Sequence, residues 1–202
     1  VHGLARRQDG LPLRGLDAAL VDDARRHHDD VATGQGLDLG ARLDADEAWL
    51  YIVETTGPHI SRMCLKESPQ GVQLVDREIF GPSHLGGFPD GIAFDVAGNL
   101  WCTLIMVDQL IALTPQGDKR VLLDDGNPPA SRKLLDKMAA GTLTTEDMLQ
   151  AHGTLAPWMA SITFGGPDLK TVYIGSLMGT SLPSFRSPVA GLPMVHWPRT
   201  PA

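Results

Sequence analysis

Three stretches of the 202-residue chain repeat one another, and this repetition limits the possible fold more than any other feature. Each has a short strand-like segment, a polar turn and a longer apolar segment rich in β-branched and aromatic residues, which predicts a β-hairpin. The three stretches are GARLDADEAWLYIVET from Gly40, GIAFDVAGNLWCTL from Gly91 and SITFGGPDLKTVYIGSL from Ser161. Leu50, Leu100 and Val172 fall at the same place in each unit.

Further strand-like runs follow the first two hairpins, at residues 59–65, 76–80, 109–115 and 119–125. Four strands per repeat are typical of the blade of a β-propeller. The repeats are about 50 and about 72 residues apart, and removing an insertion of about 30 residues from the second interval leaves roughly 40, a blade-like period. We therefore predict an all-β fold with about three recognisable propeller blades. The alternative is chance similarity among unrelated hairpins.

The insertion, residues 127–157, has the pattern of two short helices. In the first, Ser131 is a candidate N-cap and Gly141 a stop signal. The second begins at Thr144 and carries Asp147 three residues later, as in a capping box. The helices either cover the mouth of the propeller channel or have no role there.

Residues 1–40 lack the alternating pattern, and we treat them as a separate segment that is helical or disordered, followed by a propeller domain over residues 41–202. Their His27-His28 pair favours a solvated face over a metal site, because no further ligand lies at helical spacing.

Charge and cysteine content restrict the partners. The net charge of −7 argues against nucleic acid and anionic membranes, and it is compatible with divalent cations or neutral small molecules. The longest apolar run, residues 100–107, is too short to span a bilayer. Cys64 and Cys102 have no metal-ligand spacing and are expected to be reduced core thiols, which predicts a cytoplasmic protein.

Four stretches in order resemble the senescence marker protein/gluconolactonase family, also called regucalcin-like lactonases. They are LDADEAWLYIVETTG, FPDGIAFDVAGNLW, SITFGGPDLKTVYIGSL and SPVAGLPM, and the resemblance covers about residues 41–195. It implies a six-bladed propeller of which this chain is a truncated part, with the N-terminal blades missing. It also implies hydrolysis of sugar lactones or related cyclic esters with one divalent cation in the channel. We expect Ca²⁺, with Zn²⁺ and Mn²⁺ as alternatives.

The resemblance assigns the cation a Glu from the first blade, an Asn from a middle blade and the Asp of a Pro-Asp-Gly motif. The Asp is Asp90, which would also help to activate water. The blade that supplies the Glu is not found, and aligning the repeats places Leu39 at the Asn position, with Asp90 and Ala160 as its equivalents. By itself, Pro-Asp-Gly is also explained as a turn. A carboxylate at the channel end of an inner strand would instead need a neutralising cation.

Two more residues are candidates for the site. Glu54 ends the second strand of its hairpin, so it is expected on the same rim as Asp90, as a metal ligand or as a solvated loop residue. His84, in the loop before Asp90, could hydrogen-bond a sugar at the mouth or have no role.

Two functions remain open at this point. One is a gluconolactonase-like hydrolase acting on a small-molecule lactone. The other is a non-catalytic propeller remnant that only binds or oligomerises. The missing Glu and Asn favour this second function. Because an open set of blades leaves unpaired strand edges, a homodimer that completes the ring is a possible assembly.

Overall fold

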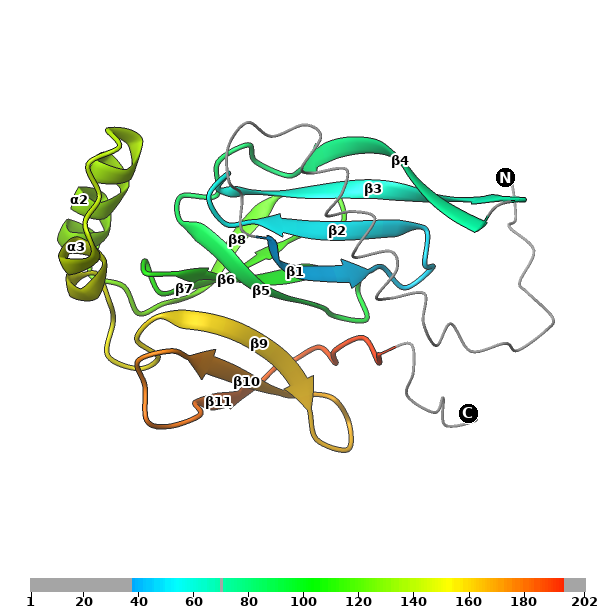
Figure 1. Cartoon of the computed structure of the whole chain (residues 1–202). Helices are drawn as coiled ribbons and strands as arrows, with labels where there is room; N and C mark the ends of the chain where they lie inside the picture. The colour runs from blue at the N-terminus through cyan, green and yellow to red at the C-terminus, as the bar shows by residue number, and fades with distance from the viewer. Residues whose placement is uncertain (1–37, 70, 195–202) are drawn as a thin grey trace.

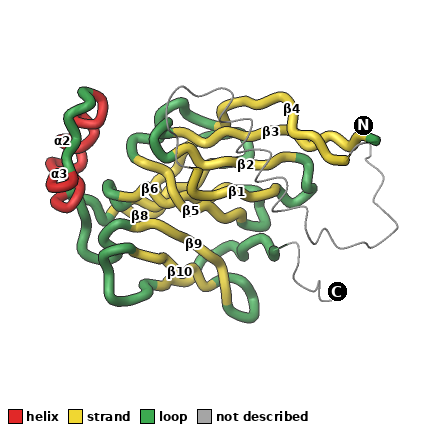
Figure 2. The backbone as a smooth tube through the Cα atoms, in the orientation of Figure 1, coloured by secondary structure: helices red, strands yellow, loops and turns green. Residues whose placement is uncertain are grey.

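The structure is a computed structural model that describes residues 38–69 and 71–194. Three antiparallel sheets lie side by side, and two helices stand at one end of them (Figures 1 and 2). The first blade consists of β1 (Asp38–Leu43), β2 (Trp49–Glu54), β3 (His59–Ser68) and β4 (Gly71–Phe80). The second consists of β5 (Phe88–Phe94), β6 (Leu100–Ile105), β7 (Gln109–Leu113) and β8 (Lys119–Asp124). The third has β9 (Met159–Gly165), β10 (Thr171–Ser176) and β11 (Ser184–Arg186).

This architecture confirms the predicted all-β fold and its three hairpin repeats. Each blade is a meander in which consecutive strands pair. The predicted equivalence of Leu50, Leu100 and Val172 is also confirmed, because their partners occupy matching positions on the innermost strands. The pairs are Leu43 with Leu50, Phe94 with Leu100, and Phe164 with Val172.

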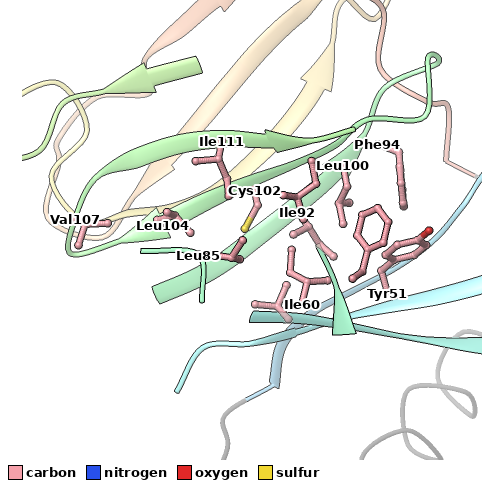
Figure 3. Close-up of a cluster of buried hydrophobic side chains, with 13 residues drawn as sticks. Tyr51, Ile60, Leu85, Ile92, Phe94, Leu100, Cys102, Leu104, Val107 and Ile111 are labelled. Atoms are coloured by element: carbon pink, nitrogen blue, oxygen red, sulfur yellow. The ribbon is translucent and has the colours of Figure 1, made fainter. Parts of the chain in front are cut away.

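The core lies between neighbouring sheets. One cluster joins the first and second blades, with Tyr51 packed edge to face against both Phe80 and Phe94. Figure 3 shows the cluster around Tyr51. A second cluster joins the second and third blades, with Trp101 edge-on to Phe164. The middle blade is therefore covered on both faces, which explains why all six residues of β6 are buried.

The insertion forms α2 (Pro128–Ala139) and α3 (Thr145–Gln150), as expected. The predicted N-cap of the first helix, Ser131, is wrong: Asn127 is the cap, and its side chain accepts a hydrogen bond from the backbone of Ala130. Proline at the first helical position is well tolerated because its missing N–H would have no partner there, so the helix begins earlier than the serine.

The capping box of the second helix is confirmed. The Thr144 hydroxyl accepts from the backbone N–H of Asp147, and the Asp147 carboxylate accepts from the backbone of Thr144. Lys137 of α2 also donates to this carboxylate at 2.6 Å and ties the two helices together. Lys137 and Thr144 hold the pKa of Asp147 well below its usual range.

Residues 1–37, with the His27-His28 pair, lie outside the described residues. No helix within residues 38–69 and 71–194 is long and apolar enough to cross a membrane. Neither cysteine in this part of the chain forms a disulfide; Cys102 is fully buried and Cys64 partly buried.

Candidate active site

A β-bulge places Asp90 in the innermost strand of the second blade. Pro89 pairs with Leu104 and Ile92 pairs with Cys102, so Asp90 and Gly91 together oppose the single residue Thr103. The Thr103 hydroxyl accepts a hydrogen bond from the Gly91 N–H at 2.9 Å and donates to the Gly91 carbonyl at 3.3 Å. The hydroxyl thus replaces ladder hydrogen bonds that the bulge interrupts, and bulges of this kind re-aim the side chains they carry.

The same irregularity recurs in the other blades. In the first, Asp38 pairs with Glu54 and Ala41 with Ile52, which leaves Leu39 and Gly40 opposite Val53. In the third, Met159 pairs with Ser176 and Ser161 with Gly175, which leaves Ala160 as the extra residue. Leu39, Asp90 and Ala160 are therefore structurally equivalent, as the aligned repeats predicted. Asp90 is the charged member of the set.

Neighbouring inner strands approach closely at these bulges. A Cβ atom on Gly91 would lie 2.6 Å from the Cα atom of Ser161 and 2.7 Å from the carbonyl oxygen of Ala160. A Cβ atom on Gly40 would lie 3.2 Å from the carbonyl oxygen of Asp90. Glycine is required at position 91 because any side chain would overlap β9. Asp90 thus lies where β1, β5 and β9 come together.

The carboxyl group of Asp90 is poorly solvated. The residue is 8% exposed, and burial raises the pKa of its carboxyl from 3.8 to about 6. Within residues 38–69 and 71–194, no group donates a hydrogen bond to this carboxyl. The fully buried Cys102 lies on the paired strand, and burial raises the pKa of its thiol to about 12. Asp90 therefore combines a buried position with an acceptor that is free to bind a proton, a water molecule or a cation.

Glu54 ends β2, opposite the start of β1. Asp90 follows the start of β5, so the two side chains belong to corresponding ends of adjacent blades. Glu54 is buried and accepts hydrogen bonds from Ser61 and from Arg77, the latter at 2.5 Å, with His59 Nε2 at 3.4 Å. Burial raises the pKa of Glu54, but the bonds from Ser61 and Arg77 outweigh it and the net pKa is lowered. Glu54 is therefore held as a carboxylate within its own blade.

His84 is exposed in the loop that leads to β5. Its Nδ1 accepts a hydrogen bond from the backbone N–H of Gly86 at 3.0 Å. In the neutral ring the proton then resides on Nε2, so this atom is a hydrogen-bond donor.

The described residues do not complete a metal site. No group of three or more His, Cys, Asp or Glu side chains in this part of the chain could hold a metal ion. Asp90 suits a hard divalent cation as one oxygen ligand, but Ca²⁺ takes six to eight. The described residues alone therefore do not fit the expected ion.

The helical insertion lies at the same end of the sheets as Asp90. Figure 1 shows α2 and α3 at the end where β5 and β9 begin. Leu134 of α2 packs with Phe88 and Ile105, the first residue of β5 and the last residue of β6. Of the two alternatives for the insertion, this position favours a cover near the mouth.

Two carboxylates that the sequence analysis missed anchor the insertion. Asp108 is fully buried and accepts backbone hydrogen bonds from Gly153, Trp158 and Met159 at 2.7, 3.1 and 2.8 Å. Asp125 accepts from the backbone of the neighbouring segment, residues 155 and 156, at 2.6 and 3.1 Å. They fix the path of the chain into β9 and hence the backbone beside Gly91.

Together, two four-stranded meanders and one three-stranded meander, whose inner strands approach one another closely, define part of a β-propeller. The chain belongs to the SMP-30/gluconolactonase/LRE-like family, whose model matches residues 15–126. The match begins upstream of residue 41, so the family likeness extends into a segment that the sequence analysis set apart.

Two curated relatives are named as lactonases. The chain is 30% identical over 173 residues to 6-deoxy-6-sulfogluconolactonase of Pseudomonas putida, covering 85% of this chain and 46% of the relative. It is 26% identical over 170 residues to a putative sugar lactone lactonase of Bacillus subtilis, covering 84% and 45%. The chain thus spans about half the length of the curated relatives it matches.

Two solved structures share the fold. A luciferin-regenerating enzyme aligns with a TM-score of 0.52 at 18% identity, over 79% of this chain and 48% of that one. A calcium-binding regucalcin from Agrobacterium tumefaciens aligns with a TM-score of 0.50 at 13% identity, over 77% and 46%. In both cases about half of the solved chain corresponds to the three blades.

Proposed function

We propose that this protein hydrolyses sugar lactones or related cyclic esters at the rim where the inner strands begin. The observation that carries the proposal is Asp90: a buried carboxyl at the inner-strand bulge with no hydrogen-bond donor among the described residues. Both curated relatives are named as lactonases, which supports the substrate class.

The proposed reaction needs a base for water. Ionised Asp90 accepts a proton from a water molecule as the oxygen of that water attacks the lactone carbonyl carbon. The ring C–O bond then breaks, and the proton passes to the departing ring oxygen, which gives the open-chain hydroxy acid. A pKa of about 6 suits this role, because the group is mostly ionised at neutral pH and still basic enough to take the proton.

Further groups would hold the substrate and a cation. His84 is proposed as a sugar contact, since its Nε2 proton is free to donate to a hydroxyl while Nδ1 stays bound to Gly86. A divalent cation, Ca²⁺ first and Zn²⁺ or Mn²⁺ as alternatives, is proposed to bind Asp90. Its remaining ligands would come from water or from outside the described residues. Glu54 stays a proposed ligand. To bind the cation, its carboxylate would have to break its hydrogen bonds with Ser61 and Arg77.

The alternative is a non-catalytic propeller that binds or assembles without turnover. It is favoured by the lack of a three-residue metal-binding group in the described part of the chain. In this case we expect a homodimer that completes the ring, because an open set of blades leaves unpaired strand edges. Cytoplasmic location, expected from the cysteines, stays a prediction.

Gluconolactone hydrolysis, followed by acid release, separates the two functions. The matched variants are Asp90→Asn, which keeps the shape and removes the base, and Asp76→Asn, which removes an exposed carboxylate paired with Lys66 on the outer strand β4. The enzyme proposal expects turnover that Asp90→Asn lowers at least 100-fold and Asp76→Asn leaves unchanged. Absence of turnover with and without added Ca²⁺, Mn²⁺ or Zn²⁺, together with a dimer in light scattering, would instead support the binding module.

A further inference from the structure

The first blade has an apolar face that lies outside its contact with the second blade. Neighbouring residues of β2 alternate between two clusters: Tyr51 and Val53 belong to the cluster shared with the second blade, whereas Leu50 and Ile52 belong to a separate one. The second blade lies between the other two, so it packs against one side of the first blade (Figure 1). The separate cluster forms the opposite side, which we call the first-blade face: Ala41, Leu43, Leu50, Ile52, Met63, Leu65, Val72 and Leu74.

The first-blade face is buried, although every described side chain in its cluster comes from the first blade itself. Leu50 and Ile52 are 4% and 6% exposed, as little as Tyr51 between the blades, which is 5% exposed. A sheet buries an apolar face by packing it against another layer. The layer that covers the first-blade face must therefore come from outside residues 38–69 and 71–194.

The third blade shows the contrasting case of a face that meets water. On its side toward the second blade, Ile162 and Val172 are buried. The residues that alternate with them are polar: Ser161, Thr163, Thr171 and Tyr173. The first two are exposed and the other two half-buried. An antiparallel sheet with one solvated face carries polar residues there, so the apolar first-blade face is built for a covering layer.

The chain itself has a segment that can supply this layer. Residues 1–37 lead directly into β1, which carries Ala41 and Leu43 of the first-blade face. The family model matches from residue 15 onward, so residues 15–37 fall within the same family match as the first two blades. This segment includes the apolar residues Leu16, Leu20, Val21, Val31 and Leu37.

Other occupants fit the first-blade face less well. Residues 195–202 continue from the second blade, where Gly191 pairs with Asp95 and the Leu192 N–H donates to the carbonyl of Phe94 at 2.8 Å. A second copy that completes the ring would bring its polar third-blade face against the first-blade face, with little apolar area to bury. Moreover, the first-blade face is already buried within a single chain.

We propose that residues 15–37 pack on the first-blade face and cover this side of the propeller within one chain. The segment thereby supports β1, whose Gly40 lies so close to β5 that a Cβ atom on it would be 3.2 Å from the carbonyl oxygen of Asp90. The first-blade face is then not available to a second copy of the chain. This inference does not depend on the proposed lactonase activity.

Photocrosslinking in the full chain tests the proposal. A benzoylphenylalanine probe replaces Leu65, which is half-buried on the first-blade face and pairs with the buried Leu74. The matched control carries the probe at Thr163, on the polar face of the third blade. Mixing unlabelled and isotope-labelled chains before irradiation distinguishes products within one chain from products between chains.

We expect the probe at position 65 to crosslink to residues 15–37 within one chain, and the control to give no product with this segment. Products that join labelled and unlabelled chains would show that a second copy covers the face, and they overturn the proposal. Products with residues 195–202, or equal patterns from probe and control, overturn it as well.

Amide hydrogen exchange of the variant Leu16→Ser/Leu20→Ser gives a second measurement. Loss of buried leucine contacts should speed exchange in β2 at least about tenfold, while β10 in the third blade stays unchanged as an internal reference. The matched control is Leu4→Ser/Leu11→Ser, which lies upstream of the family match and should leave both strands unchanged. Equal exchange in β2 for the two variants overturns the proposal. Neither measurement requires lactone turnover, so the proposed function can fail without affecting this inference.

Discussion

Replacing Asp90 by asparagine should make the metal-free protein more stable at alkaline pH. The reason is that the carboxylate is buried without a hydrogen-bond donor among the described residues, so its charge is disfavoured in the folded state. A raised folded-state pKa means that the folded protein binds this proton more tightly than the unfolded chain. The group's favourable contribution is therefore fully present below pH 3.8 and is lost as pH rises through about 6.

The magnitude follows from the two pKa values. A difference from 3.8 to about 6 corresponds to about 3 kcal/mol at pH 8 and about 1 kcal/mol at pH 4.5. Solvent reaches part of the carboxyl and neighbouring groups relax, so we expect about half of these figures. Asparagine should thus stabilise the protein by about 1 kcal/mol more at pH 8 than it does at pH 4.5. Any packing cost of the amide is the same at both pH values.

The assay is urea unfolding of wild type and Asp90→Asn at both pH values, with a chelator present. The difference between the two proteins isolates Asp90 from every other titrating group. If the difference does not change with pH, or if asparagine becomes less favourable at pH 8, the carboxyl is not desolvated and the reasoning about the site fails. When Ca²⁺ replaces the chelator, it should stabilise wild type at pH 8 and leave the variant unchanged, because a cation needs the carboxylate.

Four other predictions concern the surrounding structure. Asp108→Ala leaves three backbone N–H groups without an acceptor and should cost about 3–5 kcal/mol in urea unfolding; a loss below about 1 kcal/mol would show that water replaces it. Gly91→Ala forces its methyl group onto β9 and should lower both stability and lactonase activity, with intact activity as the contrary result. Glu54→Gln should remove stability that is present at neutral pH and that wild type loses as the pH falls below 4.5, seen as a smaller acid dependence of the unfolding free energy. Thr144→Ala should cost about 1 kcal/mol through loss of the capping box, measured as faster amide exchange in α3, and unchanged exchange would contradict the role of the cap.

Much of the fold could be predicted because blade strands carry local signals. Alternation, β-branched residues and polar turns mark the hairpins, and their common register aligns Leu39, Asp90 and Ala160 from the sequence alone. The capping box at Thr144 and Asp147 was equally readable, since all of its hydrogen bonds lie within four residues. Such patterns can be recognised in a sequence because the groups that interact with one another are close in the chain.

Interactions over long separations in sequence could not be predicted in this way. Asp108 is bound by backbone groups 45 to 51 residues later in the chain, and in the sequence it resembles any polar turn residue. The hydrogen bonds of Glu54 with Ser61 and Arg77 depend likewise on strand register and a bulge in β4. A sequence pattern shows which residues are polar, but only the packed sheets show which of them are already satisfied.

This distinction decides how Asp90 is interpreted. A turn aspartate would accept hydrogen bonds from its own backbone, as Asp95 does from Ala97 and Asn99 at the next turn. Asp90 lies instead within strand β5, and burial alone raises the pKa of its carboxyl. Leucine or alanine, as at the equivalent positions, would avoid that cost. A side chain that folding disfavours at neutral pH, at the point where three inner strands meet, supports the proposed catalytic role of Asp90.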